Sequence, residues 1–367
     1  MGSEKVRIGV VGGGFGAAFQ WHLHPNCRVE AVAEMRPERR EGLQGLYGCE
    51  KAYASLDELL ADDQVEAVAV FSGVPDHARH SIAAMDAGKH CICAVPVAMT
   101  LEDCAAVIAA KERNGVRYMM AETSYYRWET ILLRDLYEAG EFGEVLYSEV
   151  EYYHPVYDGH AERNALWWDP EGNRTWRYGF APFLYPTHST GFLVGVTRER
   201  LTKVAALGWG PGDDDALGPG RNAYDNPFTL GASMMQTDRG HICRCNVMWG
   251  IHAHGERAQW FGQNAAAYMP GCAGQPLIVQ RHGKPDIVEL PHYFERLPES
   301  LRQTSGHGGS HTFLTHEFVS ALVEDREPAV SVYEAVAMTA PGIVAHESCL
   351  RSGPQLDVPS FDPPGAP

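Results

Sequence analysis

The first third of the chain alternates short runs of β-branched residues with helical stretches, and this alternation limits the fold more than any other feature. Strands that alternate with helices in this way form parallel βαβ units rather than a sandwich or a bundle. The expected strands are 6–11, 28–33, 66–71, 90–93 and 116–121. The expected helices are 15–24, 37–47, 55–61, 76–87 and 100–114. The sequence therefore predicts an α/β fold whose N-terminal part is a doubly wound parallel sheet.

A glycine-rich segment, Gly12-Gly13-Gly14-Phe15-Gly16-Ala17, closes the first expected strand and opens the first expected helix. In this context a G-x-G-x-x-G/A pattern indicates a dinucleotide site of the Rossmann type. Gly12 allows a tight turn, Gly14 lets a diphosphate approach the backbone, and N–H groups at the helix start face the anion. The alternative is a glycine-rich turn that only packs.

Glu34 ends the second expected strand, twenty residues beyond Gly14. An acid at this place can accept both ribose hydroxyls of NAD and repel the 2′-phosphate of NADP. Arg36 weakens this preference, because a guanidinium could bind that phosphate. We therefore expect NAD as the cofactor, with NADP less favoured.

After residue 123 the pattern changes to longer strands that alternate apolar and polar residues, as in an antiparallel sheet with one covered face. These strands are expected near 144–153, 201–209, 227–237, 240–249 and 256–262, with helices at 128–139, 311–324 and 332–350. We expect three parts: a Rossmann domain (1–123), a substrate-binding α/β domain with a large open, mostly antiparallel sheet (124–352), and a Pro-rich tail (353–367) that is extended or disordered. An open sheet needs covering, so a homodimer or homotetramer is expected.

The composition excludes several classes of protein. The 30 Lys and Arg against 47 Asp and Glu give a charge of −17 without a basic block, which disfavours nucleic acid and anionic membrane surfaces. Apolar runs such as 65–71 and 91–98 are shorter than the ~18 to 20 residues of a membrane span. The N-terminus lacks a secretory signal, and the nine cysteines contain no Cys-x-x-Cys pair. A cytoplasmic protein is expected.

Seventeen histidines raise the question of a metal site. The sequence contains no His-Glu-x-x-His motif and no Asp-rich calcium loop. Histidine pairs occur at 22/24, 252/254 and 311/316, each without a third ligand at a recognisable spacing. No metal is expected.

Four stretches, spread from residue 6 to about 350, resemble the Gfo/Idh/MocA family of NAD(P)-dependent sugar-active enzymes. They are the glycine motif, 74–80, 87–96, and Tyr185-Pro186-Thr187-His188. The resemblance implies a Rossmann domain and an α/β domain whose open sheet mediates oligomers while its other face closes the substrate pocket. The residues expected to contact or border the dinucleotide are Gly12, Gly13, Gly14, Phe15, Gly16, Glu34, Arg36, Pro75, His77, Ala94 and Pro96.

One departure from the family pattern bears on the reaction. Typical dehydrogenases of this family end the fifth strand with Glu-Lys-Pro, and the lysine contacts the reacting hydroxyl. Here the tripeptide is Ala94-Val95-Pro96. Since Val95 cannot donate, accept or titrate, another acid or base has to serve if the chain is catalytic.

The segments 119–122, 176–177, 185–188 and 306–309 resemble, in that order, those of NAD-dependent glycoside hydrolases of the α-N-acetylgalactosaminidase type. The resemblance implies that NAD oxidises a sugar at C3, the C2 proton is lost, the C1 substituent leaves, water adds and the hydride returns. A redox-neutral glycosidase is therefore the leading hypothesis. The alternatives are a stoichiometric sugar or polyol dehydrogenase and a non-catalytic dinucleotide-binding regulator.

Three residues are the candidate catalytic groups. His188 and Tyr185 lie three apart at the start of an expected helix, whose N-terminus favours a neutral imidazole suited to act as a base. The alternative for His188 is a capping or packing role. Glu122, after the sixth strand, could bind sugar hydroxyls or relay a proton, or form an ion pair with Arg127.

Four further residues are candidate substrate contacts. Arg177 follows Trp176 in an aromatic segment that could clamp a sugar, or could simply pack between loop and sheet. His307 lies in a flexible Gly-rich loop, and His311 could take its place as the contact. Tyr268 is a weaker candidate, based on its position in a strand turn alone.

Overall fold

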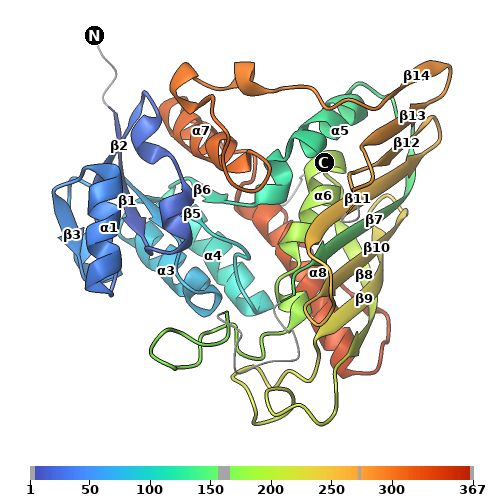
Figure 1. The fold of residues 1–367 in the computed structure, drawn as a ribbon, viewed down its shortest axis with the longest axis horizontal. Coiled ribbons are helices and arrows are strands. Elements are labelled where there is room, and N and C mark those ends of the chain that lie inside the picture. Colours follow the sequence, from blue (N-terminus) through green and yellow to red (C-terminus); the bar gives the residue numbers. More distant parts are fainter. Residues whose placement is uncertain (1–4, 156–165, 272–273, 364–367) are drawn as a thin grey trace. The chain divides into compact units, whose positions relative to one another are not determined.

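The computed structural model describes residues 5–155, 166–271 and 274–363, which form two compact units (Figure 1). The first unit falls within Met1–Trp128 and His292–Val336, and the second within Glu129–Pro291 and Ala337–Pro367. This grouping differs from the sequence-based division at residue 124, because residues 292–336 belong to the first unit. One bond that ties them there is donated by the Met120 N–H to the Val330 carbonyl oxygen, at 3.0 Å. This hydrogen bond joins the strand Tyr118–Met120 to the segment that follows the helix Ser310–Val323.

The first unit is built on a six-stranded sheet in the order β3-β2-β1-β4-β5-β6, in which every neighbouring pair is parallel. Its strands are β1 (Val6–Val11), β2 (Cys27–Ala33), β3 (Lys51–Tyr53), β4 (Ala67–Val70), β5 (His90–Cys93) and β6 (Tyr118–Met120). The doubly wound parallel sheet expected from the sequence is therefore confirmed. Strand β3 was not expected, because three half-buried residues are too few to show a period of two.

The helices of the first unit are α1 (Pro37–Tyr47), α2 (Leu56–Leu60), α3 (His77–Asp86), α4 (Leu101–Asn114) and α7 (Ser310–Val323). The expected helix at 15–24 is wrong: the chain forms two short 3₁₀ turns, η1 (Phe15–Ala18) and η2 (Trp21–Leu23). The Tyr47 hydroxyl lies 2.7 and 3.0 Å from the carbonyl oxygens of Gly16 and Phe19, which it bonds in place of helical N–H groups. The stacking of Phe19 on Phe71, at 4.5 Å between ring centroids, holds the turn against the sheet.

The second unit contains a nine-stranded sheet in the order β14-β13-β12-β11-β7-β10-β9-β8-β15. Its strands are β7 (Val145–Tyr153), β8 (Leu201–Trp209), β9 (Leu230–Thr237), β10 (Ile242–Met248), β11 (Gly255–Gly262), β12 (Ala265–Tyr268), β13 (Ile278–Arg281), β14 (Lys284–Ile287) and β15 (Leu356–Asp357). Only β7 and β10 pair in parallel, so the expected large, mostly antiparallel sheet is confirmed.

The two faces of this sheet differ in chemistry. Helix α6 (Thr187–Thr197) lies against β7, β10 and β11 of this sheet (Figure 1). Side chains of these strands such as Val150, Cys245 and Trp260 are buried. The opposite face carries a row of charges, in which the Arg244 guanidinium lies 2.6 Å from Glu149 and 2.7 Å from a neighbouring carboxylate. The helices α5 (Trp128–Glu138) and α8 (Val332–Leu350) complete the list for the described chain.

The described part of the tail is extended and pairs with the sheet of the second unit. Its strand β15 pairs with β8, where Leu356 lies opposite Val204. The Arg200 guanidinium lies 2.9 Å from the carboxylate of Asp362. Residues 364–367 lie outside the described part of the chain. Among the described helices, none combines the length and the apolar character needed to cross a membrane.

Candidate functional site

The glycine loop after β1 has the geometry that a dinucleotide site needs. Gly12 has a φ of +97°, and a Cβ there would lie 2.4 Å from the Phe71 carbonyl oxygen, so only glycine fits. A Cβ on Gly16 would lie 3.1 Å from the Phe71 ring, which leaves little room. At Gly14, by contrast, no atom lies within 4 Å of the Cβ position. This open space above the backbone is where a diphosphate can approach.

Glu34 closes the other side of this loop. Its carboxylate accepts a hydrogen bond of 2.6 Å from the Gly13 N–H and one of 3.0 Å from the Arg36 N–H. The carboxylate is thereby fixed at the carboxyl end of β2, the edge at which doubly wound sheets bind their ligands. Each carboxylate oxygen has a second lone pair, so both can still accept a ribose hydroxyl. The residues present therefore fit a dinucleotide.

The end of β5 is buried and apolar. Ala94, Val95 and Pro96 are all buried, and the Val95 side chain is 3% exposed. His77 is also buried, with ring nitrogens 2.8 Å from the Pro96 carbonyl oxygen and 3.0 Å from that of Ser72. Burial lowers the pKa of His77. These contacts make His77 a link between two loops at the edge of the sheet.

Two other candidates of the first unit lie at different depths. Glu122 is fully buried, and its carboxylate accepts a 2.8 Å hydrogen bond from the Ser124 N–H, which caps the turn after β6. Pro75 is exposed in the 3₁₀ turn Val74–Asp76, directly before α3.

His307 is exposed, whereas His311 is 2% exposed and stacks on Phe19 at 4.7 Å between ring centroids. Of the two histidines, only His307 is therefore accessible to a ligand.

In the second unit, Tyr185 and His188 come together as the sequence predicts. Helix α6 begins at Thr187, so His188 is in its first turn, and the two ring centroids are 5.3 Å apart. Tyr152 of β7 lies edge-on to His188 at 4.9 Å and stacks with Tyr185 at 6.1 Å. All three side chains are buried.

Arg177 and Trp176 join the same cluster. The Arg177 guanidinium carbon lies 4.2 Å from the centre of the Trp176 ring and 5.8 Å from that of Tyr185. The Trp176 ring in turn stacks with Tyr185 at 6.5 Å. A guanidinium held between aromatic faces presents its N–H donors in a fixed plane, which suits the hydroxyl or carbonyl oxygens of a sugar.

The structure adds residues that the sequence analysis missed. His154 follows directly after the end of β7, with its ring 6.4 Å from Trp249 and 5.0 Å from His254. Burial, and then the positive charge of Arg177, lower the pKa of His154 to about 4. Trp249 lies 5.4 Å from Tyr152. The sequence carried a signal for these residues. They continue the alternation of β7 and β10, in which every second side chain points to the buried face.

Tyr268 does not join this cluster. Strand β12 pairs Tyr268 with Gln259, and Gln259 lies opposite Glu149 on β7. Side chains of a strand alternate between faces, so Tyr268 shares the face of Glu149, and Tyr152 points to the other face. Its ring packs against Phe261 at 5.6 Å instead.

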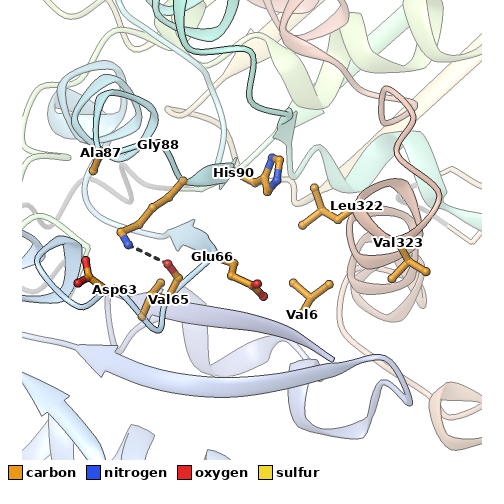
Figure 2. Close-up of a pocket in the computed structure, with 10 residues that line it drawn as sticks. Val6, Asp63, Val65, Glu66, Ala87, Gly88, His90, Leu322 and Val323 are labelled. Atoms are coloured by element: carbon orange, nitrogen blue, oxygen red, sulfur yellow. Dashed lines mark hydrogen bonds between the residues drawn. The ribbon is translucent and has the colours of Figure 1, made fainter. Parts of the chain in front are cut away.

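A hollow in the first unit lies at the amino ends of the parallel strands, the edge of the sheet that does not bind dinucleotides in doubly wound folds. This pocket has a volume of about 600 Å³ and is lined by Val6, Glu66, Lys89 and His90 at the amino ends of β1, β4 and β5. Val6, Glu66 and His90 are labelled in Figure 2. The Lys89 ammonium donates to the Val65 carbonyl, at 2.7 Å, and is therefore engaged with the backbone. Ligands of doubly wound sheets bind at the opposite, carboxyl edge. Among the described residues, no three His, Cys, Asp or Glu side chains are grouped to hold a metal ion.

Comparisons with known proteins agree with these features. A model of the oxidoreductase family with an NAD-binding Rossmann fold matches residues 6–122, and a model of the glycosyl hydrolase 109 C-terminal domain matches residues 283–363. A glycosyl hydrolase family 109 protein of Stenotrophomonas maltophilia is 24% identical over 410 residues, which cover 98% of this chain and 89% of that protein. An alpha-N-acetylgalactosaminidase of Shewanella oneidensis is 32% identical over 211 residues, covering 51% of this chain and 43% of the relative.

Solved structures show the same fold. A levoglucosan dehydrogenase in complex with NADH and L-sorbose has a TM-score of 0.79 at 19% identity, covering 98% of this chain and all of that chain. An NAD-binding oxidoreductase of Klebsiella pneumoniae has a TM-score of 0.80 at 17% identity, with 97% and 100% covered. The chain is thus similar to oxidoreductases with an NAD-binding Rossmann fold over residues 6–122 and to glycosyl hydrolase 109 proteins over residues 283–363, and one member of the latter family aligns with nearly the whole chain.

Proposed function

We propose that this protein is an NAD-dependent glycosidase that cleaves its substrate without net oxidation. The observation that carries the proposal is Val95, a buried apolar side chain where a dehydrogenase of this family needs a lysine. Val95 cannot take the proton that a hydroxyl loses on oxidation, so the usual dehydrogenase pattern of the family is absent and another residue has to take this proton. The similarity to glycosyl hydrolase 109 proteins over the C-terminal segment supports the same reading.

The first unit is proposed to hold the dinucleotide. The open space at Gly14 takes the diphosphate, and the fixed Glu34 carboxylate accepts the ribose hydroxyls and disfavours NADP. Bound NAD supplies a reversible acceptor for a hydride from the sugar. Because the chemistry restores the cofactor in each cycle, we propose that NAD remains tightly bound between turnovers.

The second unit is proposed to bind the sugar and to move its protons. His188 is the base that takes a proton from the sugar, since it is buried, lies in the first turn of a helix and contacts two tyrosine rings. The Tyr185 hydroxyl is the acid that protonates the leaving group. Arg177, stacked on Trp176, orients the sugar through its hydroxyl oxygens. Glu122 is proposed to bind a sugar hydroxyl or relay a proton.

The substrate is proposed to be a glycoside with an oxidisable hydroxyl next to an acidifiable C–H, such as an α-N-acetylgalactosaminide, the class named for one relative. Self-association through the open face of the nine-stranded sheet is also proposed. Exposed apolar side chains on that sheet, Leu207, Trp209 and Met234, support it. A cytoplasmic location is proposed from the eight reduced cysteines among the described residues.

The test follows two products in one cuvette. The purified protein is mixed with a panel of nitrophenyl glycosides, and nitrophenol release and the NADH absorbance at 340 nm are recorded together. We expect many turnovers of nitrophenol per protein without accumulation of NADH, and loss of turnover in His188→Asn. His282→Asn, an exposed histidine in the β13–β14 hairpin, is the matched control and should keep full activity.

A stoichiometric dehydrogenase is the second candidate, supported by the likeness of the whole chain to sugar oxidoreductases. It predicts that one NADH forms for each substrate molecule consumed. It also predicts that no nitrophenol is released unless NADH forms. That result would overturn the glycosidase proposal. Binding of NAD without turnover of any glycoside or polyol would instead identify a non-catalytic regulator.

A further inference from the structure

The loop before α7 is wrapped around the ring of His311. A Cβ on Gly306 would lie 2.5 Å from the His311 ring, so the backbone approaches this ring as only glycine allows. The next three residues, His307, Gly308 and Gly309, all have left-handed backbones, with φ of 52°, 66° and 90°. For His307 this conformation is uncommon and carries a cost. The loop is therefore built to place His307 in a defined position.

His311 fixes the hydrogen-bonding state of His307. The His311 Nδ1 lies 3.1 Å from the Ala18 carbonyl oxygen, which can only accept, so this nitrogen carries the proton. Burial lowers the pKa of His311 to about 4, which keeps the ring neutral. Its Nε2 is then an acceptor and bonds the N–H at Nδ1 of His307, at 2.9 Å. The Nε2 of His307 is consequently the nitrogen that gains or loses a proton.

The same contacts place His307 beside the dinucleotide loop of the first unit. Phe15, the residue after Gly14, lies edge-on to His307 at 5.8 Å and to His311 at 5.4 Å. Phe19, four residues further on, stacks on His311. His307 therefore contacts the ring of Phe15, the residue that directly follows the open space at Gly14.

The glycine loop itself offers little positive potential to an anion. The expected helix after β1 is replaced by a 3₁₀ turn of four residues, which lacks the aligned dipoles of a helix N-terminus. Two N–H groups of the loop are already used within the protein: that of Gly12 bonds the Ala33 carbonyl, and that of Gly13 bonds the Glu34 carboxylate. With two N–H groups of the loop engaged, a donor from another segment strengthens the binding of a diphosphate here.

We propose that His307, positioned by His311, binds the diphosphate of the dinucleotide. This inference rests on the proposed binding of NAD by the first unit, and it replaces the expected role of His307 as a sugar contact. The His307 ring binds as an imidazolium, with Nε2–H donating to a phosphate oxygen and Nδ1–H donating to His311. A charge-assisted pair of this kind is the strong form of such a bond.

Binding of nucleotide fragments tests the proposal without any turnover. Calorimetry of the nucleotide-stripped protein with ADP-ribose, ADP and adenosine separates the diphosphate from the base and ribose. His307→Ala should weaken ADP-ribose and ADP roughly 10- to 100-fold and leave adenosine within about twofold. His311→Phe keeps an aromatic ring on Phe19 but removes the acceptor, so an intermediate loss is expected. His282→Ala is the matched control and should bind like the unaltered protein.

Three results would overturn the proposal. These are unchanged binding of ADP-ribose by His307→Ala, an equal loss for adenosine, and a failure of the unaltered protein to bind ADP-ribose at all. Melting curves of each variant identify a loss caused by unfolding, and His307→Gln, which keeps an N–H donor, should then recover part of the affinity. The glycosidase proposal can fail independently, since a protein that binds ADP-ribose through His307 need not release nitrophenol.

Discussion

Replacing Gly14 and Gly12 separately by alanine distinguishes the site of the cofactor from the needs of the fold. At Gly14 the added methyl group meets no atom within 4 Å, and the backbone φ is −82°. We expect the free energy of unfolding to change by about 1 kcal/mol or less. The same methyl group occupies the space proposed for the diphosphate, and a displaced contact that costs about 1.4 to 2.8 kcal/mol raises the Kd for NAD 10- to 100-fold.

Gly12→Ala should give the opposite pattern. A φ of +97° is unfavourable for alanine by about 1 to 2 kcal/mol, and the methyl group would lie 2.4 Å from a backbone oxygen of Phe71. The forced shift adds about 1 to 3 kcal/mol, for a total of about 2 to 5 kcal/mol. This corresponds to a melting temperature lower by roughly 4 to 20 °C for a unit of this size.

Calorimetric titration gives the Kd for NAD of each variant, and thermal unfolding gives its stability. Gly45→Ala is the matched control, because Gly45 is exposed within α1 and its Cβ position is also open. It should stabilise the protein slightly, by about 0.5 to 1 kcal/mol, and leave NAD binding unchanged. Folded Gly14→Ala protein that binds NAD as tightly as the unaltered protein would refute the placement of the diphosphate.

Further predictions concern the proposed roles and the effect of pH. His188→Asn should lower kcat roughly 10²- to 10⁴-fold with unchanged melting, and activity near normal would remove His188 as the base. Glu34→Gln should raise the Kd for NAD about tenfold and that for NADP less, as measured by calorimetry; equal changes would contradict the charge argument. Arg177→Lys should raise KM more than it lowers kcat, because the stacked donor plane is lost; an unchanged KM would speak against a sugar contact. Burial lowers the pKa of His24 to about 4. Below about pH 6.5 the unfolded chain therefore binds a proton that the folded chain does not. The free energy of unfolding should fall by at most about 3 kcal/mol towards pH 4. Urea unfolding of His24→Gln should show a flatter pH dependence, and an identical slope would refute this origin.

Much of the first unit follows from the sequence because its signals are local. The strands of the parallel sheet are continuous apolar runs such as Ala67–Val70, and the helices between them carry their own caps, as at Thr100. The glycine loop and Glu34 also belong to one βαβ unit, so their spacing along the chain suffices to predict their meeting at one edge of the sheet. Tyr185 and His188 are three residues apart at a helix start, and they meet for the same reason.

Only the tertiary structure decided the features that depend on contacts between distant segments. The helix expected at 15–24 gives way to 3₁₀ turns, because Tyr47 bonds two of its carbonyls and Phe19 packs on Phe71. The face on which Tyr268 lies depends on the register of two strand pairs, which no local pattern specifies. The hydrogen bond between His307 and His311 could not be predicted either. It depends on the Ala18 carbonyl, almost three hundred residues from His311, which fixes the proton on Nδ1 of His311. Local periodicity determines which elements form, whereas register and long-range hydrogen bonds determine which side chains meet.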